Sequence, residues 1–268
     1  MKAKRLLIFV LACLLLCSGC DAQPPQTTEP TEYAMPESLY TPEDFRNVDG
    51  KLLCIGGNAV MGIDVSSHQG KINWTKVAAA GVRFAFVRLG YRAYGTGELF
   101  EDSYQRVNLE GARAAGIAVG AYFFSQAVSV EEAREEAEFA LSILDGFSLD
   151  LPLVYDWEYV NDTARTAQVN RRMLTDCTLA FCARVSMANY RPMIYFNTSQ
   201  ALDRLYMQEL EQFPWWLAKY DYTTELVCRA DLWQYSDQGT LSGITGKVDL
   251  NLLFTDYGLG AEILDLLY

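Results

Sequence analysis

The sequence predicts an α/β fold, specifically an irregular TIM-like (β/α) barrel whose helices are incomplete in the last third of the chain. Eight short apolar runs, each compatible with a buried strand, follow one another between residues 59 and 251, and helical patterns separate the first five. Alternation of strands and helices is typical of a parallel sheet with helical crossovers, and eight strands suit a closed barrel.

The strand candidates are runs of five to eight mainly apolar residues. They occupy residues 59–65, 82–89, 118–124, 151–158, 192–196, 215–220, 231–235 and 247–251. The rival fold is an open doubly wound sheet, which usually carries a glycine-rich phosphate-binding turn after its first strand. Here the first run leads into Asp64-Val-Ser-Ser-His68, which contains no glycine. We therefore favour the barrel.

The first helices have recognisable ends. Residues 74–80 and 103–115 are each followed by glycine, which commonly terminates a helix. Ser129 and Glu132 form a capping box at the start of a third helix, and Gly146 closes it. These signals place helices after the first, second and third strand candidates.

Helical pattern weakens towards the end of the chain. A fourth helix is predicted from a stripe of apolar residues that recurs every fourth position and should face the core: Val169, Met173, Cys177, Phe181 and Val185. After residue 195 only residues 199–212 retain a helical pattern. The barrel should therefore lack helices in its last third.

The composition limits the classes of partner. The chain has 268 residues, of which 22 are basic and 34 acidic, giving a net charge of −12. Such a chain is unsuited to nucleic acid or to anionic lipid as its main partner. His68 is the only histidine, and we expect no metal site, no cofactor and a monomeric protein.

The N-terminus has the organisation of an export signal. A basic start precedes an apolar stretch over residues 6–17, which is short for a membrane span. Cys17-Ser18-Gly19-Cys20 is similar to a lipoprotein cleavage site, although Cys17 occupies a position where leucine is usual. We expect residues 1–19 to be a lipoprotein-type signal peptide, Cys20 to carry lipid, and the protein to be exported and membrane-anchored only through that lipid. Ordinary secretion without lipid is the alternative.

A flexible tether is expected to follow the signal peptide. Residues 20–52 are rich in Pro, Thr, Glu and Gln, a composition that buries too little apolar surface to fold. Residues 53–268 would then form the catalytic domain. Its four cysteines, too few for a disulfide scaffold, are Cys54, Cys177, Cys182 and Cys228. A buried thiol is expected at Cys177, and a Cys54–Cys228 bridge remains open.

Two acids at the end of the fourth run carry the main functional signal. Asp156 and Glu158 are two residues apart, so on a strand they share a face, about 6.6 Å apart along the backbone. Cleavage of a glycosidic bond needs such a pair, one acid to donate a proton and one to stabilise positive charge. The alternative is an ordinary strand end that meets water.

Other polar and aromatic residues lie near the ends of the remaining strand candidates. Barrel enzymes place their chemistry at the carboxyl ends of the strands. Carboxylates bind sugar hydroxyls or move protons, and aromatic rings stack on pyranose rings. The set predicts a sugar-binding cleft and comprises Asp64, Tyr122, Tyr195, Lys219, Tyr220, Trp233, Gln234, Asp249 and Asn251.

Each of these residues also has a structural explanation. Asp64 and Asp249 could cap turns, and Tyr122, Tyr195 or Trp233 could be core aromatics. A serine hydrolase triad built around His68 is disfavoured, because the chain has no G-x-S-x-G nucleophile turn. We interpret His68 as a structural residue near the cleft.

The order of several motifs resembles that of the lysozymes of glycoside hydrolase family 25, the N-acetylmuramidases. The resemblance covers residues 60 to about 254 and leaves out the leader and tether. Its motifs are Gly62-Ile-Asp-Val-Ser-Ser-His-Gln-Gly70, Ile72-Asn-Trp74, Phe84-Ala-Phe-Val-Arg88, Gly116-Ile-Ala-Val-Gly-Ala-Tyr-Phe-Phe124, Asp156-Trp-Glu158, Pro192-Met-Ile-Tyr195, Trp216-Leu-Ala-Lys-Tyr220, Trp233-Gln-Tyr-Ser236 and Gly246-Lys-Val-Asp-Leu-Asn251.

The resemblance implies an exported muramidase that cuts the β-1,4 bond between N-acetylmuramic acid and N-acetylglucosamine in peptidoglycan. It implies that Glu158 is the general acid and that Asp156 assists the substrate's 2-acetamido group as it attacks the anomeric carbon. Asp64 and Asp249 would be supporting acids, and Tyr122, Tyr195 and Trp233 would contact sugar. The alternatives are a catalytically silent wall-binding module and a glycosidase that acts on another amino-sugar polymer.

Overall fold

The computed structural model describes residues 33–268, with gaps at residues 222–225, 257 and 263–268. The predicted signal peptide, residues 1–19, and the predicted lipidation site Cys20 lie outside the described residues, as does the tether as far as residue 32. In the part that is described, no helix combines the length and the apolar character needed to cross a bilayer.

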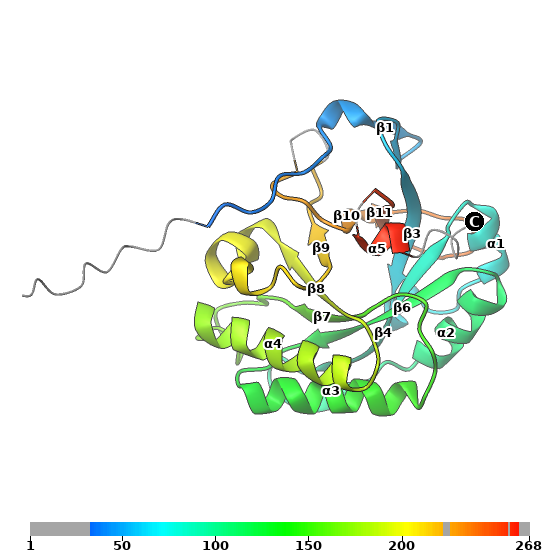
Figure 1. Ribbon diagram of the computed structural model, residues 1–268. Coiled ribbons are helices and arrows are strands. Elements are labelled where there is room, and N and C mark those ends of the chain that lie inside the picture. Colours follow the sequence, from blue (N-terminus) through cyan, green and yellow to red (C-terminus); the bar gives the residue numbers. More distant parts are fainter. Residues whose placement is uncertain (1–32, 222–225, 257, 263–268) are drawn as a thin grey trace, which may run out of the picture. The chain divides into compact units, whose positions relative to one another are not determined.

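Eight strands close into a barrel, as the sequence predicted (Figure 1). The ring is completed where the first strand pairs with the second, and β5 (Leu99–Glu101) adds to the second strand outside the ring. In order around the barrel the strands are β3 (Ala59–Val65), β4 (Phe84–Arg92), β6 (Ala118–Ser125), β7 (Leu153–Trp157), β8 (Pro192–Asn197), β9 (Trp215–Ala218), β10 (Leu232–Gly239) and β11 (Val248–Phe254).

One strand of the barrel runs against the others. β11 is antiparallel to both of its neighbours, β10 and β3, whereas every other neighbouring pair in the ring is parallel. The parallel sheet predicted from the sequence is therefore wrong for this strand. Residues 240–247, which join β10 to β11, are too few for the crossover that a parallel pair needs, so the two strands form a hairpin.

Helices cover only part of the barrel, as predicted. They are α1 (Trp74–Ala79), α2 (Gln105–Ala114), α3 (Val130–Leu144) and α4 (Arg171–Met187), followed by a short α5 (Gly258–Glu262) after the last strand. The helix predicted at residues 199–212 is wrong, because that stretch forms a π-helical turn (Gln200–Arg204) and a 3-10 turn (Met207–Glu209). Ser129 begins α3 as predicted, with its hydroxyl accepting the Glu132 N–H.

The apolar stripe of α4 is only partly the predicted one. Cys177, Phe181 and Val185 are fully buried, but Val169 lies before the helix, whose cap residue is Asn170. A spacing of exactly four residues drifts around a helix of 3.6 residues per turn, so the buried face also takes in neighbouring positions. The four cysteines of the domain are free thiols, and the Cys54–Cys228 bridge is not formed.

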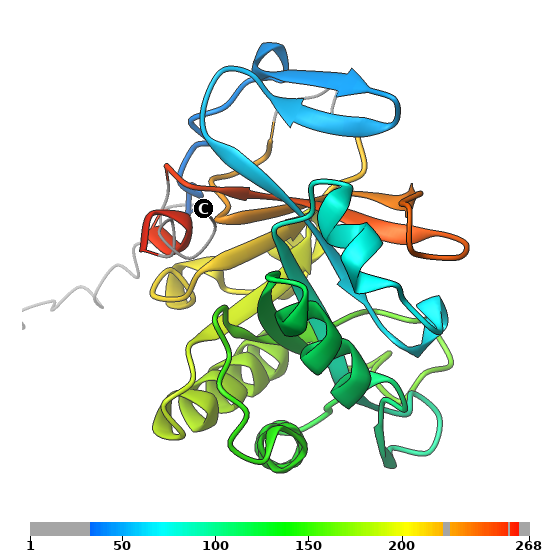
Figure 2. The same ribbon diagram turned by 90° about the vertical axis from the view of Figure 1, so that its right-hand side faces the viewer.

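An N-terminal hairpin covers strands that have no helix. Its strands, β1 (Phe45–Val48) and β2 (Lys51–Cys54), lie beside β10 and β11 (Figure 2, blue beside orange and red). The Phe45 ring meets Trp233 edge-on at a centroid distance of 5.0 Å, and Leu52 is fully buried. The Leu52 N–H donates to the Tyr235 hydroxyl at 3.3 Å.

The predicted C-terminal boundary of the tether, residue 52, is therefore too late, because the folded unit begins at Ala34. Residues Ala34–Tyr268 form one compact unit, which includes much of the stretch assigned to the tether. Tyr40 is buried, stacks on Phe254 at 4.5 Å and donates its hydroxyl to Asp256 at 2.6 Å. Average composition concealed this, because a few apolar side chains on one face of a hairpin are enough to anchor it.

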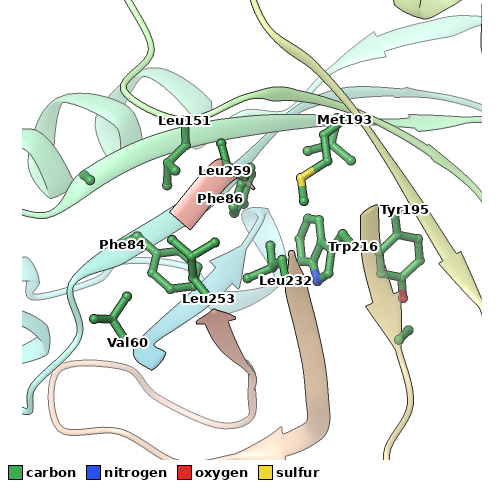
Figure 3. Packing of buried hydrophobic residues seen from close by; sticks show 13 residues of the cluster. Val60, Phe84, Phe86, Leu151, Met193, Tyr195, Trp216, Leu232, Leu253 and Leu259 are labelled. Atoms are coloured by element: carbon green, nitrogen blue, oxygen red, sulfur yellow. The ribbon is translucent and has the colours of Figure 1, made fainter. Parts of the chain in front are cut away.

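The inside of the barrel is a packed core (Figure 3). Phe84 and Phe86 on β4 point inward and meet edge-on at 6.1 Å. Gly62 and Gly120 make room for these rings, since a Cβ at either glycine would lie 2.3–2.4 Å from a ring carbon. Apolar side chains thus fill the interior of the barrel, and polar groups can gather only at the mouth, where the parallel strands end.

The hairpin should contribute to the stability of the whole domain. Replacing Leu52 with alanine should lower the free energy of unfolding by about 2–5 kcal/mol, because it leaves a cavity between the hairpin and β10. Urea unfolding followed by circular dichroism measures the loss. Leu53→Ala is the matched control, because Leu53 is 47% exposed on the same strand. Equal effects of the two substitutions would contradict the packing role.

Candidate active site

A pocket of about 210 Å³ lies at the mouth of the barrel. It contains the four carboxyls predicted from the sequence, together with the three predicted tyrosines and the predicted glutamine. Its lining residues are Asp64, Ser66, His68, Gln69, Arg88, Tyr122, Phe124, Asp156, Glu158, Tyr195, Trp216, Tyr220, Gln234 and Asp249.

Strand alternation explains why these side chains meet. On β7, Val154 belongs to the core cluster, and Asp156 and Glu158 follow it at intervals of two, so all three face the barrel axis. On the reversed strand β11 the same layers occur in the opposite order, with Leu253 in the core and Asp249 near the start of the strand. Asp249 reaches the mouth because β11 is reversed, and not because it lies at a carboxyl end.

Asp64 is held by two amide side chains. Its Oδ2 accepts hydrogen bonds from Gln234 Nε2 at 2.9 Å and from Asn251 Nδ2 at 2.8 Å. The indole N–H of Trp216 donates to Asn251 Oδ1 at 2.9 Å, which fixes the orientation of that amide. Burial raises the pKa of Asp64, and the two amide donors oppose this by favouring its ionised form.

Asp156 has fewer hydrogen bonds than Asp64. Asp156 is 6% exposed, and its buried Oδ1 has no hydrogen-bond partner among the described residues. Burial, followed by the negative charges of Glu158 and Asp64, raises the pKa of Asp156 well above its ordinary value. Burial and the charge of Asp64 also raise the pKa of Glu158. Both carboxyls are therefore biased towards holding a proton.

Asp249 lies directly across the strand pair from Asp64. Burial, with the negative charge of Asp64 next, raises the pKa of Asp249 to about 9. At neutral pH this carboxyl keeps its proton beside an Asp64 whose amide donors favour ionisation. The surroundings of these two acids thus differ in how strongly they favour ionisation, and acid–base chemistry uses such differences.

Arg88 is a lining residue that the sequence analysis did not select. Its guanidinium pairs with buried Asp102 at 2.8 Å, and Nη2 also donates to Ser67 Oγ at 3.2 Å. The positive charge lowers the pKa of Asp156, although less than burial raises it. The sequence could have indicated this residue, because Arg88 is the one charged position in the alternating series Phe84, Phe86, Arg88, whose members share one face of the strand.

Aromatic side chains form the floor and rim of the pocket. Trp216, which was not selected either, is 2% exposed and meets Tyr195 edge-on at 5.1 Å (Figure 3). It also meets Tyr122 edge-on at 6.3 Å. The hydroxyls of Tyr195 and Tyr220 both donate to Gln234 Oε1, at 2.9 and 3.0 Å. Tyr220 is 51% exposed and stands at the rim, where a ring can meet a sugar face.

Three of the predicted substrate-binding residues do not line the pocket. Trp233 is 1% exposed under the N-terminal hairpin, and its indole N–H donates to the Lys219 carbonyl at 2.7 Å. Lys219 is outside the pocket lining, with its ammonium donating to the Asp221 carbonyl at 2.6 Å. Asn251 is fully buried behind Asp64. Adjacent strand residues face opposite sides, so Trp233 cannot share the inward face of Gln234.

His68 lies at the pocket, as expected of a residue near the cleft. Its backbone N–H donates to Ser66 Oγ at 3.2 Å, so that hydroxyl caps a 3-10 turn (Ser67–Gln69). Ser67 is bonded through its N–H to Asp102 at 2.9 Å. Both serines therefore make local hydrogen bonds that stabilise this turn, which argues against a serine hydrolase triad built around His68.

Comparison with known proteins identifies the family. The model of glycosyl hydrolases family 25 matches residues 63–244, which is more than half of the chain. The chain belongs to glycoside hydrolase family 25. The predicted family and the prediction that the protein is a glycoside hydrolase are confirmed.

Relatives in family 25 include proteins named as lysozymes. Lysozyme M1 of Streptomyces globisporus is 28% identical over 204 residues, covering 72% of this chain and 67% of that protein. The autolytic lysozyme of Clostridium acetobutylicum is 26% identical over 192 residues, covering 71% of this chain and 54% of that protein. This chain thus spans about half the length of the Clostridium enzyme.

Solved family 25 structures share the fold. The bacterial lysozyme from Streptomyces coelicolor superposes with a TM-score of 0.65 at 28% identity, covering 78% of this chain and 97% of that chain. The modular autolysin LytC from Streptococcus pneumoniae, in complex with a synthetic peptidoglycan ligand, gives a TM-score of 0.67 at 25% identity. That alignment covers 78% of this chain and 52% of the autolysin.

The buried Asp249 should make the domain less stable as pH rises. Its carboxyl ionises near pH 3.8 when exposed and near 9 in the fold, so its contribution to stability is complete below 3.8 and is lost as pH approaches 9. Asp249→Asn should therefore raise the melting temperature at pH 8 more than at pH 4, by about 2–4 °C for each kcal/mol recovered.

Thermal melts followed by circular dichroism from pH 4 to pH 9 measure this difference. Asp203→Asn is the control, because Asp203 is exposed on the π-helical turn after β8 and is not among the groups that shift the pKa of Asp249. A melting-temperature difference that stays constant over this pH range would show that the Asp249 carboxyl is not protonated in the fold.

Proposed function

We propose that this protein is an exported muramidase that hydrolyses the β-1,4 bond between N-acetylmuramic acid and N-acetylglucosamine in peptidoglycan. The proposal rests above all on one observation: Asp156 and Glu158 lie side by side in the pocket, each with a raised pKa. Membership of family 25 and the lysozyme names of its relatives support the choice of substrate.

In this mechanism Glu158 is the general acid. Its proton moves to the glycosidic oxygen as the bond between that oxygen and the anomeric carbon breaks. Burial and the negative charge of Asp64 raise the pKa of Glu158, which favours the protonated form that a general acid needs. In the second half of the reaction the ionised carboxylate takes a proton from water as the water oxygen attacks the anomeric carbon. The bond between that carbon and the substrate's acetamido oxygen, made in the first half, breaks at the same time and restores the acetamido group.

Asp156 assists the substrate's own nucleophile. The acetamido oxygen attacks the anomeric carbon to give a cyclic oxazolinium-type intermediate, and positive charge develops on the acetamido nitrogen. Asp156 Oδ1 has no partner among the described residues and can accept the hydrogen bond from that N–H. The hydrogen bond favours the ionised form of Asp156, which then stabilises the positive charge.

The remaining pocket residues support this chemistry. Asp64, fixed by its two amide donors, supplies negative charge that raises the pKa of Glu158, and Asp249 holds a proton beside it. Tyr122, Tyr195 and Tyr220, together with Gln234, are suited to contact sugar rings and hydroxyls.

We also propose that the mature protein is anchored outside the cytoplasm through lipid on Cys20. The first residues of the folded unit suit such an anchor, because the Pro36 carbonyl accepts the Arg229 N–H at 2.7 Å, just before the start of β10. That is the end of the barrel opposite the pocket. The folded unit therefore begins at the end of the barrel away from the pocket.

Substitution of the two acids tests the proposal. Glu158→Gln should lower kcat on purified peptidoglycan by about 10²–10⁴-fold, because the leaving oxygen loses its proton donor. Asp156→Asn should lower it by about 10²–10³-fold, because the intermediate loses its counter-charge. Release of reducing sugar measures the rate, and Glu110→Gln, at an exposed position on α2, is the control.

Product analysis identifies the bond. Digested wall is reduced with borohydride, and mass spectrometry should find muramitol at the new ends. Glucosaminitol ends would show a different glycosidase, and binding of intact wall without cleavage would indicate a silent wall-binding module. Turnover by Glu158→Gln at the parent rate would refute the assignment of the acid.

A further inference from the structure

Strand pairing of β7 stops just before Glu158, so the sheet does not hold the backbone at this residue. The pairing of β7 ends at Trp157 on the β6 side and at Asp156 on the β8 side. The carbonyls of Trp157 and Glu158 therefore have no strand partner, although Trp157 is buried. Buried carbonyls are normally bonded, so something else must satisfy them.

Gln126 satisfies the carbonyl of Glu158. It follows directly after β6, is fully buried, and donates from Nε2 to the Glu158 oxygen at 2.7 Å and to the Ser125 oxygen at 2.8 Å. Its Oε1 accepts the Thr166 hydroxyl at 3.0 Å. That bond sets the direction of the amide, so its N–H groups must face the carbonyls.

Gln200 satisfies the preceding carbonyl from the opposite side. It follows β8, is 3% exposed, and donates from Nε2 to the Trp157 oxygen. Its Oε1 accepts the Asn197 N–H at 2.9 Å, which again sets the direction of the amide. The two glutamines thus reach the same two-residue stretch from the strands on either side of β7.

The scaffold behind this stretch is itself braced. Arg165 donates from Nη1 to the Gln126 carbonyl at 2.8 Å, and both terminal nitrogens bind the Glu132 carboxylate at 2.6 Å. The Trp157 indole N–H donates to the Ala127 carbonyl at 3.3 Å. Movement of the stretch would therefore require several buried hydrogen bonds to break together.

We propose that Gln126 and Gln200 are positioning residues, which clamp the peptide carbonyls before and after the Glu158 Cα and so aim the Glu158 carboxyl into the pocket. Neither glutamine lines the pocket, so each acts through the backbone. The inference rests on the proposed role of Glu158 as general acid. A shift of about 1 Å in a reacting group costs roughly 10²-fold in rate.

Replacing each glutamine with methionine, which is similar in length but cannot donate, tests the clamp. Gln126→Met and Gln200→Met should each lower kcat on peptidoglycan by about 10–100-fold with KM little changed. The alkaline limb of the kcat/KM profile should move to lower pH, because a released Glu158 carboxyl becomes more hydrated. A merely structural loss would not move that limb.

Two further variants make the result specific. Gln105→Met is the matched control, since Gln105 is a buried amide on α2 that donates to Glu101 at 2.8 Å away from the pocket. Thr166→Val frees the amide of Gln126 without removing it, and should give a smaller loss of the same kind. It replaces Gln126→Met if melting curves show that variant to be unfolded.

The outcomes separate this inference from the proposed function. Suppose that the parent protein cleaves cell wall and that Glu158→Gln does not. If Gln126→Met and Gln200→Met are then folded and keep the parent kcat and pH profile, the clamp is overturned and the proposed function stands. If the parent does not cleave wall, carbon-13 NMR titration of the Glu158 carboxyl still decides the clamp. A pKa that falls in both methionine variants and not in Gln105→Met supports it, and an unchanged pKa overturns it.

Discussion

The antiparallel insertion of β11 between β10 and β3 determines the geometry of the whole pocket. It closes the ring of strands, places Asp249 opposite Asp64, and brings the Asn251 amide into hydrogen-bonding distance of Asp64. Were β11 parallel to its neighbours, Asp249 would lie at the other end of the barrel and Asp64 would face a different row of side chains. The charge distribution at the mouth thus depends on the direction of one strand.

Unequal surroundings give the four carboxyls different properties. Asp64 has two amide donors, whereas Asp156 has a buried oxygen without a partner among the described residues. Burial raises the pKa of all four, and it is opposed at Asp64 by two hydrogen-bond donors and at Asp156 by the charge of Arg88. Of the four carboxyls, Asp64 therefore has the most hydrogen-bond donors favouring its ionised form, and such differences between neighbouring acids allow one site to supply both negative charge and a proton.

The N-terminal hairpin compensates for the missing helices. Parallel barrels bury the outer faces of their strands under helices, but no helix is described between β9 and β11. Phe45 and Leu52 cover Trp233 and Tyr235 instead. The hairpin, residues 45–54, is for this reason part of the folded domain, and it supports the strand that carries Gln234.

Sequence pattern alone determined the strand positions, the first four helices and the pairing of Asp156 with Glu158, because hydrophobic periodicity and caps are local properties. Tertiary structure decided which way β11 runs, that Trp233 faces outward, and that residues before 53 join the fold. It also revealed Arg88, Trp216 and the two glutamines behind Glu158. Those features depend on which distant segments lie beside a given strand, and periodicity within one segment carries no information about its neighbours.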